Sequence, residues 1–138
     1  MSINAESKGY KGIANWFFAQ HQKESADAKK LIDHMNAIES KIYLYPIEDV
    51  PCECDSLLDM FAHKLDHEQK ISRLLHVTTS MGEDIYDSAS IEFLTKFACE
   101  QQRVAATSRE LYEACEAAGC DSEAISLLDK RLGECNFS

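Results

Sequence analysis

Carboxylate side chains stand where helical periodicity calls for apolar ones, in separate segments of the chain. Glu24 and Asp27 lie one turn apart in the first segment, and Glu68 interrupts the second. Gln101 interrupts a third segment, with Glu100 beside it. A glutamate followed three residues later by another ligand is the spacing with which helical bundles hold iron or manganese. The pattern therefore predicts a metal site built from hard oxygen donors.

Three amphipathic stripes of helical period define the elements that carry these residues. The first stripe is formed by Ile13, Phe17, Gln20, Glu24, Asp27, Leu31, His34 and Ile38. The second is formed by Leu57, Phe61, Leu65, Glu68, Ile71, Leu75 and Thr78. The third is formed by Ser90, Leu94, Phe97, Gln101, Val104, Ser108, Leu111 and Cys115. A helix that buries a continuous face should be apolar along it, so the polar middle of each stripe needs a reason.

The expected helices span residues 9–38, 56–81 and 87–118. Glu24, Glu68 and Gln101 each fall near a midpoint, so helices aligned side by side would bring them to one level. Two carboxylates about 6 Å apart repel by about 3 kcal/mol at an effective dielectric near 20, and burial adds a cost of desolvation. Carboxylates in this position must be protonated, exposed to water or neutralised by a bound cation. Binding of a divalent cation is the simplest of these three explanations.

Purely structural interpretations of the same residues are alternatives to a metal site. The stripes could be drawn a residue off, the true faces being rotated toward Ala14, Ala28 or Ala105. His63 and His67 lie near Glu68, but they point away from the expected core and are interpreted as surface residues. The neighbouring charges are interpreted as a solvated face in i, i+4 relation, namely Lys64, Asp66, Lys70 and Arg73.

Length and composition favour a single all-α domain. The chain has 138 residues, of which 45% are hydrophobic, with two prolines and five glycines. The formal charge of −10 repels phosphate backbones and anionic membranes, so cations are favoured as partners over nucleic acid or a membrane surface. The first residues lack the apolar run of a signal peptide and no segment is apolar enough to span a membrane, so a cytoplasmic location is expected. The six cysteines are expected to be mostly free thiols there.

The connection over residues 39–55 is long and cannot be helical throughout, because it contains Pro46 and Pro51. Its roughly 17 residues reach some 55 Å at roughly 3.3 Å each. A connection of that length can leave the helices before and after it parallel, as in bundles with one long crossover.

Local signals set the remaining boundaries. Residues 1–8 are polar and are expected to be frayed. Ser56 is expected to be the N-cap of the second helix. Gly119 is expected to end the third helix, before a short helix over 122–133.

Taken in order, these segments resemble the ferritin family, specifically its prokaryotic non-haem type, from about Gly9 to Glu134. GYKGIANWFFAQHQKES is similar to the start of the family's second bundle helix, and KIYLYPIEDVP to its long crossover. LDHEQKISRLL is similar to the third helix, FLTKFACEQQ to the fourth, and SEAISLLDKRLGE to the short fifth. The resemblance implies a ferritin-like helical bundle with a long crossover, and subunits that form a hollow shell, oxidise Fe²⁺ at an intrasubunit di-iron site and store ferric mineral.

The resemblance also assigns residues by position. Glu24 falls on the bridging glutamate of the second helix, Glu68 on the ligand of the third, and Glu100 and Gln101 on the Glu-Gln pair of the fourth. Asp27 stands where the family has histidine.

Other departures from the family weaken the expected site. Arg103 and Val104 replace the acidic residues that bind a third iron in prokaryotic members. The first helix, with its glutamate ligand, is expected to be missing, so the bundle is reduced to three long helices plus a short C-terminal helix. Its open groove would then be an apolar surface that another chain covers.

The sequence therefore predicts an iron-binding and iron-storage protein that takes up Fe²⁺ and holds Fe³⁺, with residual Fe²⁺ oxidation. The expected metal ligands are Glu24, Asp27, Glu68, Glu100 and Gln101. The alternative is a catalytically silent structural or assembly subunit. A homo-oligomer is expected in either case, as a helix-swapped dimer or a ferritin-like shell, with no nucleic acid and no membrane as partner. DNA protection in the manner of mini-ferritins is disfavoured by the negative charge.

Overall fold

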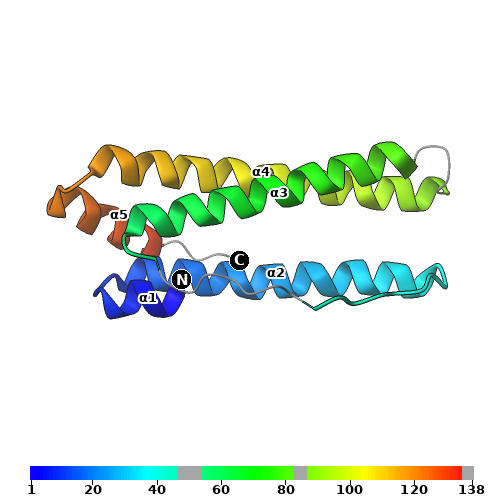
Figure 1. Ribbon diagram of the computed structural model, residues 1–138, viewed down its shortest axis with the longest axis horizontal. Coiled ribbons are helices and arrows are strands. Elements are labelled where there is room, and N and C mark those ends of the chain that lie inside the picture. Colours follow the sequence, from blue (N-terminus) through cyan, green and yellow to red (C-terminus); the bar gives the residue numbers. More distant parts are fainter. Residues whose placement is uncertain (47–53, 83–86, 135–138) are drawn as a thin grey trace. The chain divides into compact units, whose positions relative to one another are not determined.

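The computed structural model describes residues 1–46, 54–82 and 87–134, and all regular structure in these ranges is helical (Figure 1). The helices are α1 (Ser2–Ser7), α2 (Lys11–Ala37), α3 (Leu57–Gly82), α4 (Ser88–Ala118) and α5 (Ser122–Glu134). The all-α class is confirmed, and α2 to α5 begin and end within two residues of the expected ranges. The middle of the expected crossover, 47–53, lies outside the described residues. In the described ranges, no helix is both long and apolar enough to cross a membrane.

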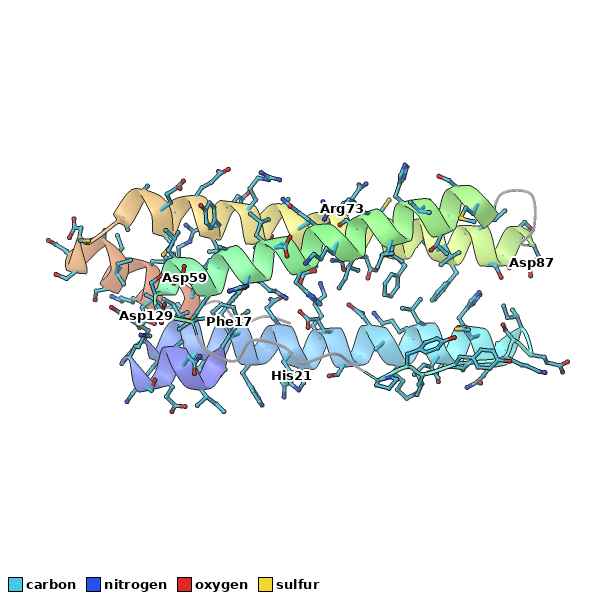
Figure 2. The ribbon with its side chains drawn as sticks, in the orientation of Figure 1. Phe17, His21, Asp59, Arg73, Asp87 and Asp129 are labelled. Carbon is cyan, nitrogen blue, oxygen red and sulfur yellow. The ribbon has the colours of Figure 1, made fainter. Side chains whose placement is uncertain are left out.

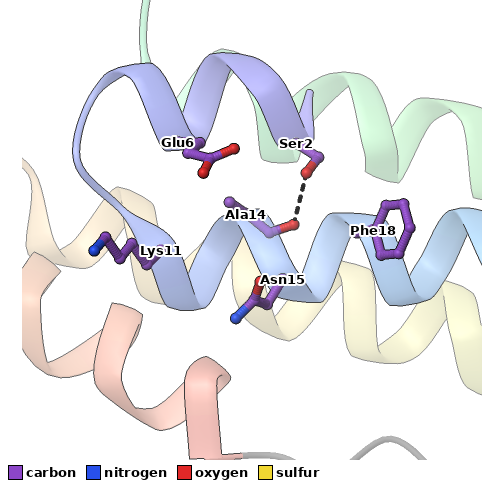
Figure 3. A pocket seen from close by; sticks show the side chains of 6 residues that line it. All are labelled: Ser2, Glu6, Lys11, Ala14, Asn15 and Phe18. Atoms are coloured by element: carbon purple, nitrogen blue, oxygen red, sulfur yellow. Dashed lines mark hydrogen bonds between the residues drawn. The ribbon is translucent and has the colours of Figure 1, made fainter.

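Helix α1 corrects the expectation that residues 1–8 are frayed. Ala5 is fully buried, and its carbonyl oxygen accepts a hydrogen bond from the Tyr10 N–H at 3.0 Å. The Ser2 hydroxyl donates to the carbonyl oxygen of Ala14 in α2 at 2.9 Å (Figure 3). A single helical turn or two is not stable alone in water, so α1 forms because α2 gives it a surface to pack on. Gly9, with φ of +90°, makes the turn between them.

The helices of the described residues group into two compact units. Helices α1, α2 and α5 belong to the first unit, and α3 and α4 belong to the second, which spans Asp55–Asp121. Within the first unit α2 contacts both α1 and α5. Within the second, α3 and α4 lie side by side and antiparallel (Figure 1).

In the first unit, α5 packs closely on the beginning of α2. The carboxylate Oδ1 of Asp129 accepts a hydrogen bond from the backbone N–H of Ile13 at 2.8 Å, and Figure 2 labels this aspartate. Tyr10 at the N-cap position of α2 makes no side-chain capping bond. Asp129 therefore satisfies one of the unpaired N–H groups at the start of α2 from a distant part of the chain. Buried apolar side chains of both helices accompany this contact, namely Ile13, Ala14, Trp16, Phe17, Ile125, Leu128 and Leu132.

In the second unit, local caps set the ends of the hairpin helices. The hydroxyl of Ser56 accepts a hydrogen bond from the Asp59 N–H at 3.1 Å, and the Asp59 carboxylate accepts one from the Ser56 N–H at 3.0 Å. This reciprocal pair confirms Ser56 as the N-cap of α3. Asp87 caps α4 by accepting from the Ser90 N–H at 2.8 Å, and Figure 2 labels Asp59 and Asp87. Gly119, with φ of +53°, ends α4 as expected.

Candidate metal centre

The α3–α4 hairpin buries Glu68 and holds it against Gln101. Only 1% of Glu68 is exposed. The amide Nε2 of Gln101 donates to the carboxylate Oε2 of Glu68, and the same nitrogen lies 3.5 Å from the Glu68 backbone oxygen. The structure thus brings together, inside one unit, two of the three residues that the sequence places at helix midpoints.

The position of Lys64 corrects the sequence analysis, which placed this residue on a solvated face. It is 5% exposed, and its ammonium Nζ forms an ion pair with the carboxylate Oε1 of Glu68. Asp66 and Lys70, assigned to the same face, are exposed and pair with each other at 2.6 Å. Arg73 is exposed as well (Figure 2). Lys64 differs from them because it lies one helical turn before Glu68, on the side of α3 that Glu68 also occupies.

The buried face of α3 is rotated slightly from the expected stripe. Its buried residues are Leu57, Met60, Phe61, Lys64, Glu68 and Leu75. Leu65, which the stripe included, is only half-buried. The i, i+4 relation between Lys64 and Glu68 was visible in the sequence and could have identified the pair. The sequence favoured an exposed pair because lysines are mostly exposed and charges four residues apart are typical of a solvated helix face.

The surroundings of Glu68 favour its charged form. Burial by itself raises the pKa of this carboxyl, since it penalises a charge. The hydrogen bond and positive charge of Lys64, together with the hydrogen bond from Gln101, outweigh that effect and leave the pKa of Glu68 below its ordinary value. Glu68 is therefore a carboxylate at neutral pH.

The other expected ligands are distributed over both units. Glu24 and Asp27 lie on α2 in the first unit, where the carboxylate of Asp27 pairs with Lys30 Nζ at 2.8 Å. Glu100 lies on α4 in the second unit and is exposed, unlike its neighbour Gln101. A joint centre of all five residues stays a prediction.

The side-chain oxygens of Glu68 and Gln101 are of the kind that binds a hard cation. The Lys64 ammonium already places one positive charge beside Glu68. Carboxylate and amide oxygens are ligands for hard and borderline divalent ions such as Mn²⁺ and Fe²⁺. Oε1 of Glu68 forms an ion pair with the Lys64 ammonium. The ammonium thus supplies a positive charge at an oxygen that would otherwise be available to a metal ion.

A hollow lies between α1 and α2, apart from the Glu68 site (Figure 3). It measures about 380 Å³ and is lined by Ser2, Glu6, Lys11, Ala14, Asn15 and Phe18. Its two ionisable side chains, Glu6 and Lys11, are both exposed. Because no buried charge points to a ligand there, Glu68 is the stronger candidate for chemistry.

The fold and this site together define an all-α protein whose antiparallel helices bury a carboxyl group against a carboxamide. The chain belongs to the ferritin family, since the family model of the ferritin-like domain matches residues 1–118.

Known proteins with a similar sequence include bacterial non-heme ferritins. A bacterial non-heme ferritin of Bacteroides fragilis is 28% identical over 134 residues, which are 97% of this chain and 83% of that protein. One of Staphylococcus aureus is 26% identical over 137 residues, covering 99% of this chain and 82% of that protein.

Known proteins with a similar structure include archaeal ferritins. An engineered closed form of the Archaeoglobus fulgidus ferritin superposes with a TM-score of 0.92 at 31% identity, over 100% of this chain and 84% of that chain. The open-pore ferritin of the same archaeon superposes with a TM-score of 0.91 at 31% identity, over 98% and 83% of the two chains.

Proposed function

We propose that this chain binds and stores iron. Membership of the ferritin family supports iron binding in general. The observation that carries the proposal is Glu68, a carboxyl side chain that is almost completely buried and accepts a hydrogen bond from Gln101. Burying a carboxylate is costly unless an opposite charge lies beside it. A protein that takes up a cation needs buried carboxylates of this kind.

The site that we propose consists of Glu24, Asp27, Glu68, Glu100 and Gln101. Glu24 and Asp27 lie three residues apart on one helix, the spacing at which two side chains reach one ion. Asp27 supplies oxygen where the family has a histidine nitrogen, and oxygen is an acceptable donor for Fe²⁺. Fe²⁺ is the substrate of this site, and its residual oxidation by dioxygen removes one electron from each ion.

Anaerobic titration with Fe²⁺ followed by admission of air tests the proposal. The expected result is ferric absorbance that develops faster than in a protein-free blank and slows on Glu68→Gln. Asp66→Asn is the matched control, because Asp66 lies on the same helix but is exposed and paired with Lys70. Ferric absorbance no faster than the blank would overturn iron uptake, and equal loss in both variants would remove Glu68 from the site.

The catalytically silent alternative is supported by one observation, the Lys64 ammonium on Glu68. A subunit that had lost iron oxidation would keep its carboxylate neutralised by a fixed internal cation. The same titration separates the alternatives, since a silent subunit would show no oxidation above the blank while remaining part of an assembly.

We further propose that the protein is a homo-oligomer. Large apolar side chains remain exposed on α3, namely Leu74, Val77 and Met81, and after α2, namely Tyr43, Leu44 and Tyr45. Such surfaces on a chain of 15.6 kDa are expected to be covered by another copy. Light scattering distinguishes a shell of many hundreds of kilodaltons from a helix-swapped dimer, and a monomer would contradict the proposal.

The cytoplasm is the compartment that we propose. Cys54, Cys99, Cys115 and Cys120 are free cysteines, which persist in a reducing environment. Cell fractionation that recovers the protein outside the cytoplasm would overturn this location.

A further inference from the structure

Lys64 occupies an unusual position for a lysine. Its side chain is 6% exposed and that of Glu68 is 1% exposed, so both partners of the ion pair are removed from water. A lysine is almost never buried unless it is paired. Two other lysine–carboxylate pairs one turn apart, Lys70–Asp66 on the same helix and Lys96–Glu92 on α4, are exposed on both sides. The buried pair is therefore a specific feature of the interior and not part of the general surface pattern.

The two oxygens of the Glu68 carboxylate are engaged by different groups. Oε2 accepts a hydrogen bond from the neutral amide of Gln101. Oε1 contacts the ammonium of Lys64. A metal ion that used Oε1 would meet the ammonium at the same oxygen, and two cations at one oxygen repel each other strongly in a dry interior.

We propose that Lys64 is an internal counter-ion that competes with metal ions for Glu68, so that a divalent cation binds this carboxylate only when the ammonium is displaced. This inference rests on the proposed function in that both use Glu68, but it concerns which cation neutralises the carboxylate. Lys64 thereby sets the metal affinity of the centre without being a ligand. The length and flexibility of a lysine side chain allow its ammonium to move while its backbone stays in the helix.

The test measures Mn²⁺ binding by following the electron paramagnetic resonance signal of free Mn²⁺. Manganese is a hard divalent ion that accepts oxygen ligands and is not oxidised during the titration. The variant is Lys64→Gln, which removes the charge and keeps a polar group beside Glu68. The matched control is Lys70→Gln, which removes the same charge from the exposed side of the same helix.

Lys64→Gln is expected to bind Mn²⁺ about tenfold more tightly at one site per chain, because its buried competitor is gone. Lys70→Gln and Lys64→Arg, which retains the charge, are expected to match the wild-type protein at that site. The gain should disappear in Lys64→Gln combined with Glu68→Gln. Unchanged affinity in Lys64→Gln, or a gain that survives in the double variant, would overturn the inference.

A measurement on the wild-type protein covers the case in which the variant does not fold. Acetylation of Lys64 by an amine-specific reagent is quantified by mass spectrometry, with and without saturating Zn²⁺. A displaced ammonium predicts a larger acetylated fraction at Lys64 with the metal, relative to the exposed Lys70. An unchanged fraction would count against displacement.

Iron uptake by the wild-type protein is scored separately. If Lys64→Gln gains Mn²⁺ affinity while the wild-type protein stores no iron, the proposed function fails and the competition stands. If the wild-type protein stores iron while Lys64→Gln gains nothing, the competition fails and the proposed function stands.

Discussion

Asp129 of α5 accepts a hydrogen bond at 2.8 Å from the backbone N–H of Ile13 in the first turn of α2. The two residues are separated by 116 positions in the sequence. The carboxylate does for α2 what an N-cap side chain usually does from the adjacent position, and its negative charge also suits the positive end of the helix dipole. This tertiary cap links the last helix to the first long one.

Asp129→Ala is expected to lower the free energy of unfolding by about 1–2 kcal/mol, the usual cost of losing an N-cap. Urea denaturation followed by circular dichroism measures the change. Asp129→Asn should recover part of the loss, because its amide oxygen still accepts a hydrogen bond. Asp33→Ala serves as the control, since Asp33 is in an exposed pair with Lys29. Equal losses in the Asp33 and Asp129 variants would contradict the tertiary cap.

Gly12→Ala is expected to destabilise the protein, although alanine ordinarily stabilises a helix relative to glycine. A Cβ at Gly12 would lie 1.8 Å from the backbone oxygen of Asp129, so the two helices would have to move apart. Overpacking of this kind costs about 1–3 kcal/mol or more. Thermal unfolding checks the sign, and a raised melting temperature would show that α5 does not approach α2 in solution.

The buried ion pair predicts strong non-additivity between its two partners. Lys64→Met leaves Glu68 as an uncompensated buried charge, and Glu68→Leu does the same to Lys64, so each is expected to cost about 3–5 kcal/mol. The double variant removes both charges and is expected to be far less destabilised than the sum of the two. A double-mutant cycle in urea measures the coupling. Additive losses would mean that the two charges do not interact in solution.

Glu68 also predicts how stability depends on pH. Its pKa is lowered in the folded protein, against the cost of burial, by Lys64 and Gln101. The unfolded chain therefore takes up the proton first as pH falls, and the stabilisation that is present above the unfolded pKa is lost as pH falls through the folded pKa. Urea denaturation between pH 7 and pH 3 should show that the free energy of unfolding declines less steeply with falling pH for Glu68→Gln than for the wild-type protein.

Glu92→Gln is the control for the pH experiment. The pKa of Glu92 is also lowered, through its hydrogen bond and charge contact with Lys96, but the pair is exposed. Exposed pairs contribute little to stability because water screens them. The free energy of unfolding of Glu92→Gln should decline with falling pH as that of the wild-type protein does. If Glu92→Gln changed this decline as much as Glu68→Gln, the effect would come from removing any negative charge and not from burial of Glu68.

Features that depend on neighbouring residues could be predicted from the sequence. The helical period and its breaks determine where α2, α3 and α4 begin and end, because backbone hydrogen bonds join residues four apart. The Ser56 cap and the Gly119 terminus are determined within single turns in the same way. The meeting of Glu68 and Gln101 followed from a short connection between two helices of similar length.

The tertiary structure alone decided which charges are buried and which short segments fold. The i, i+4 relation of Lys64 to Glu68 is visible in the sequence, but the same relation joins exposed pairs, and only the packing of α3 removes the Lys64 ammonium from water. Helix α1 and the cap at Ile13 both depend on surfaces supplied by distant residues, Ala14 and Asp129. The physical reason is that the cost of burying a charge or ordering a short helix is local, whereas the contacts that offset it come from elsewhere in the chain.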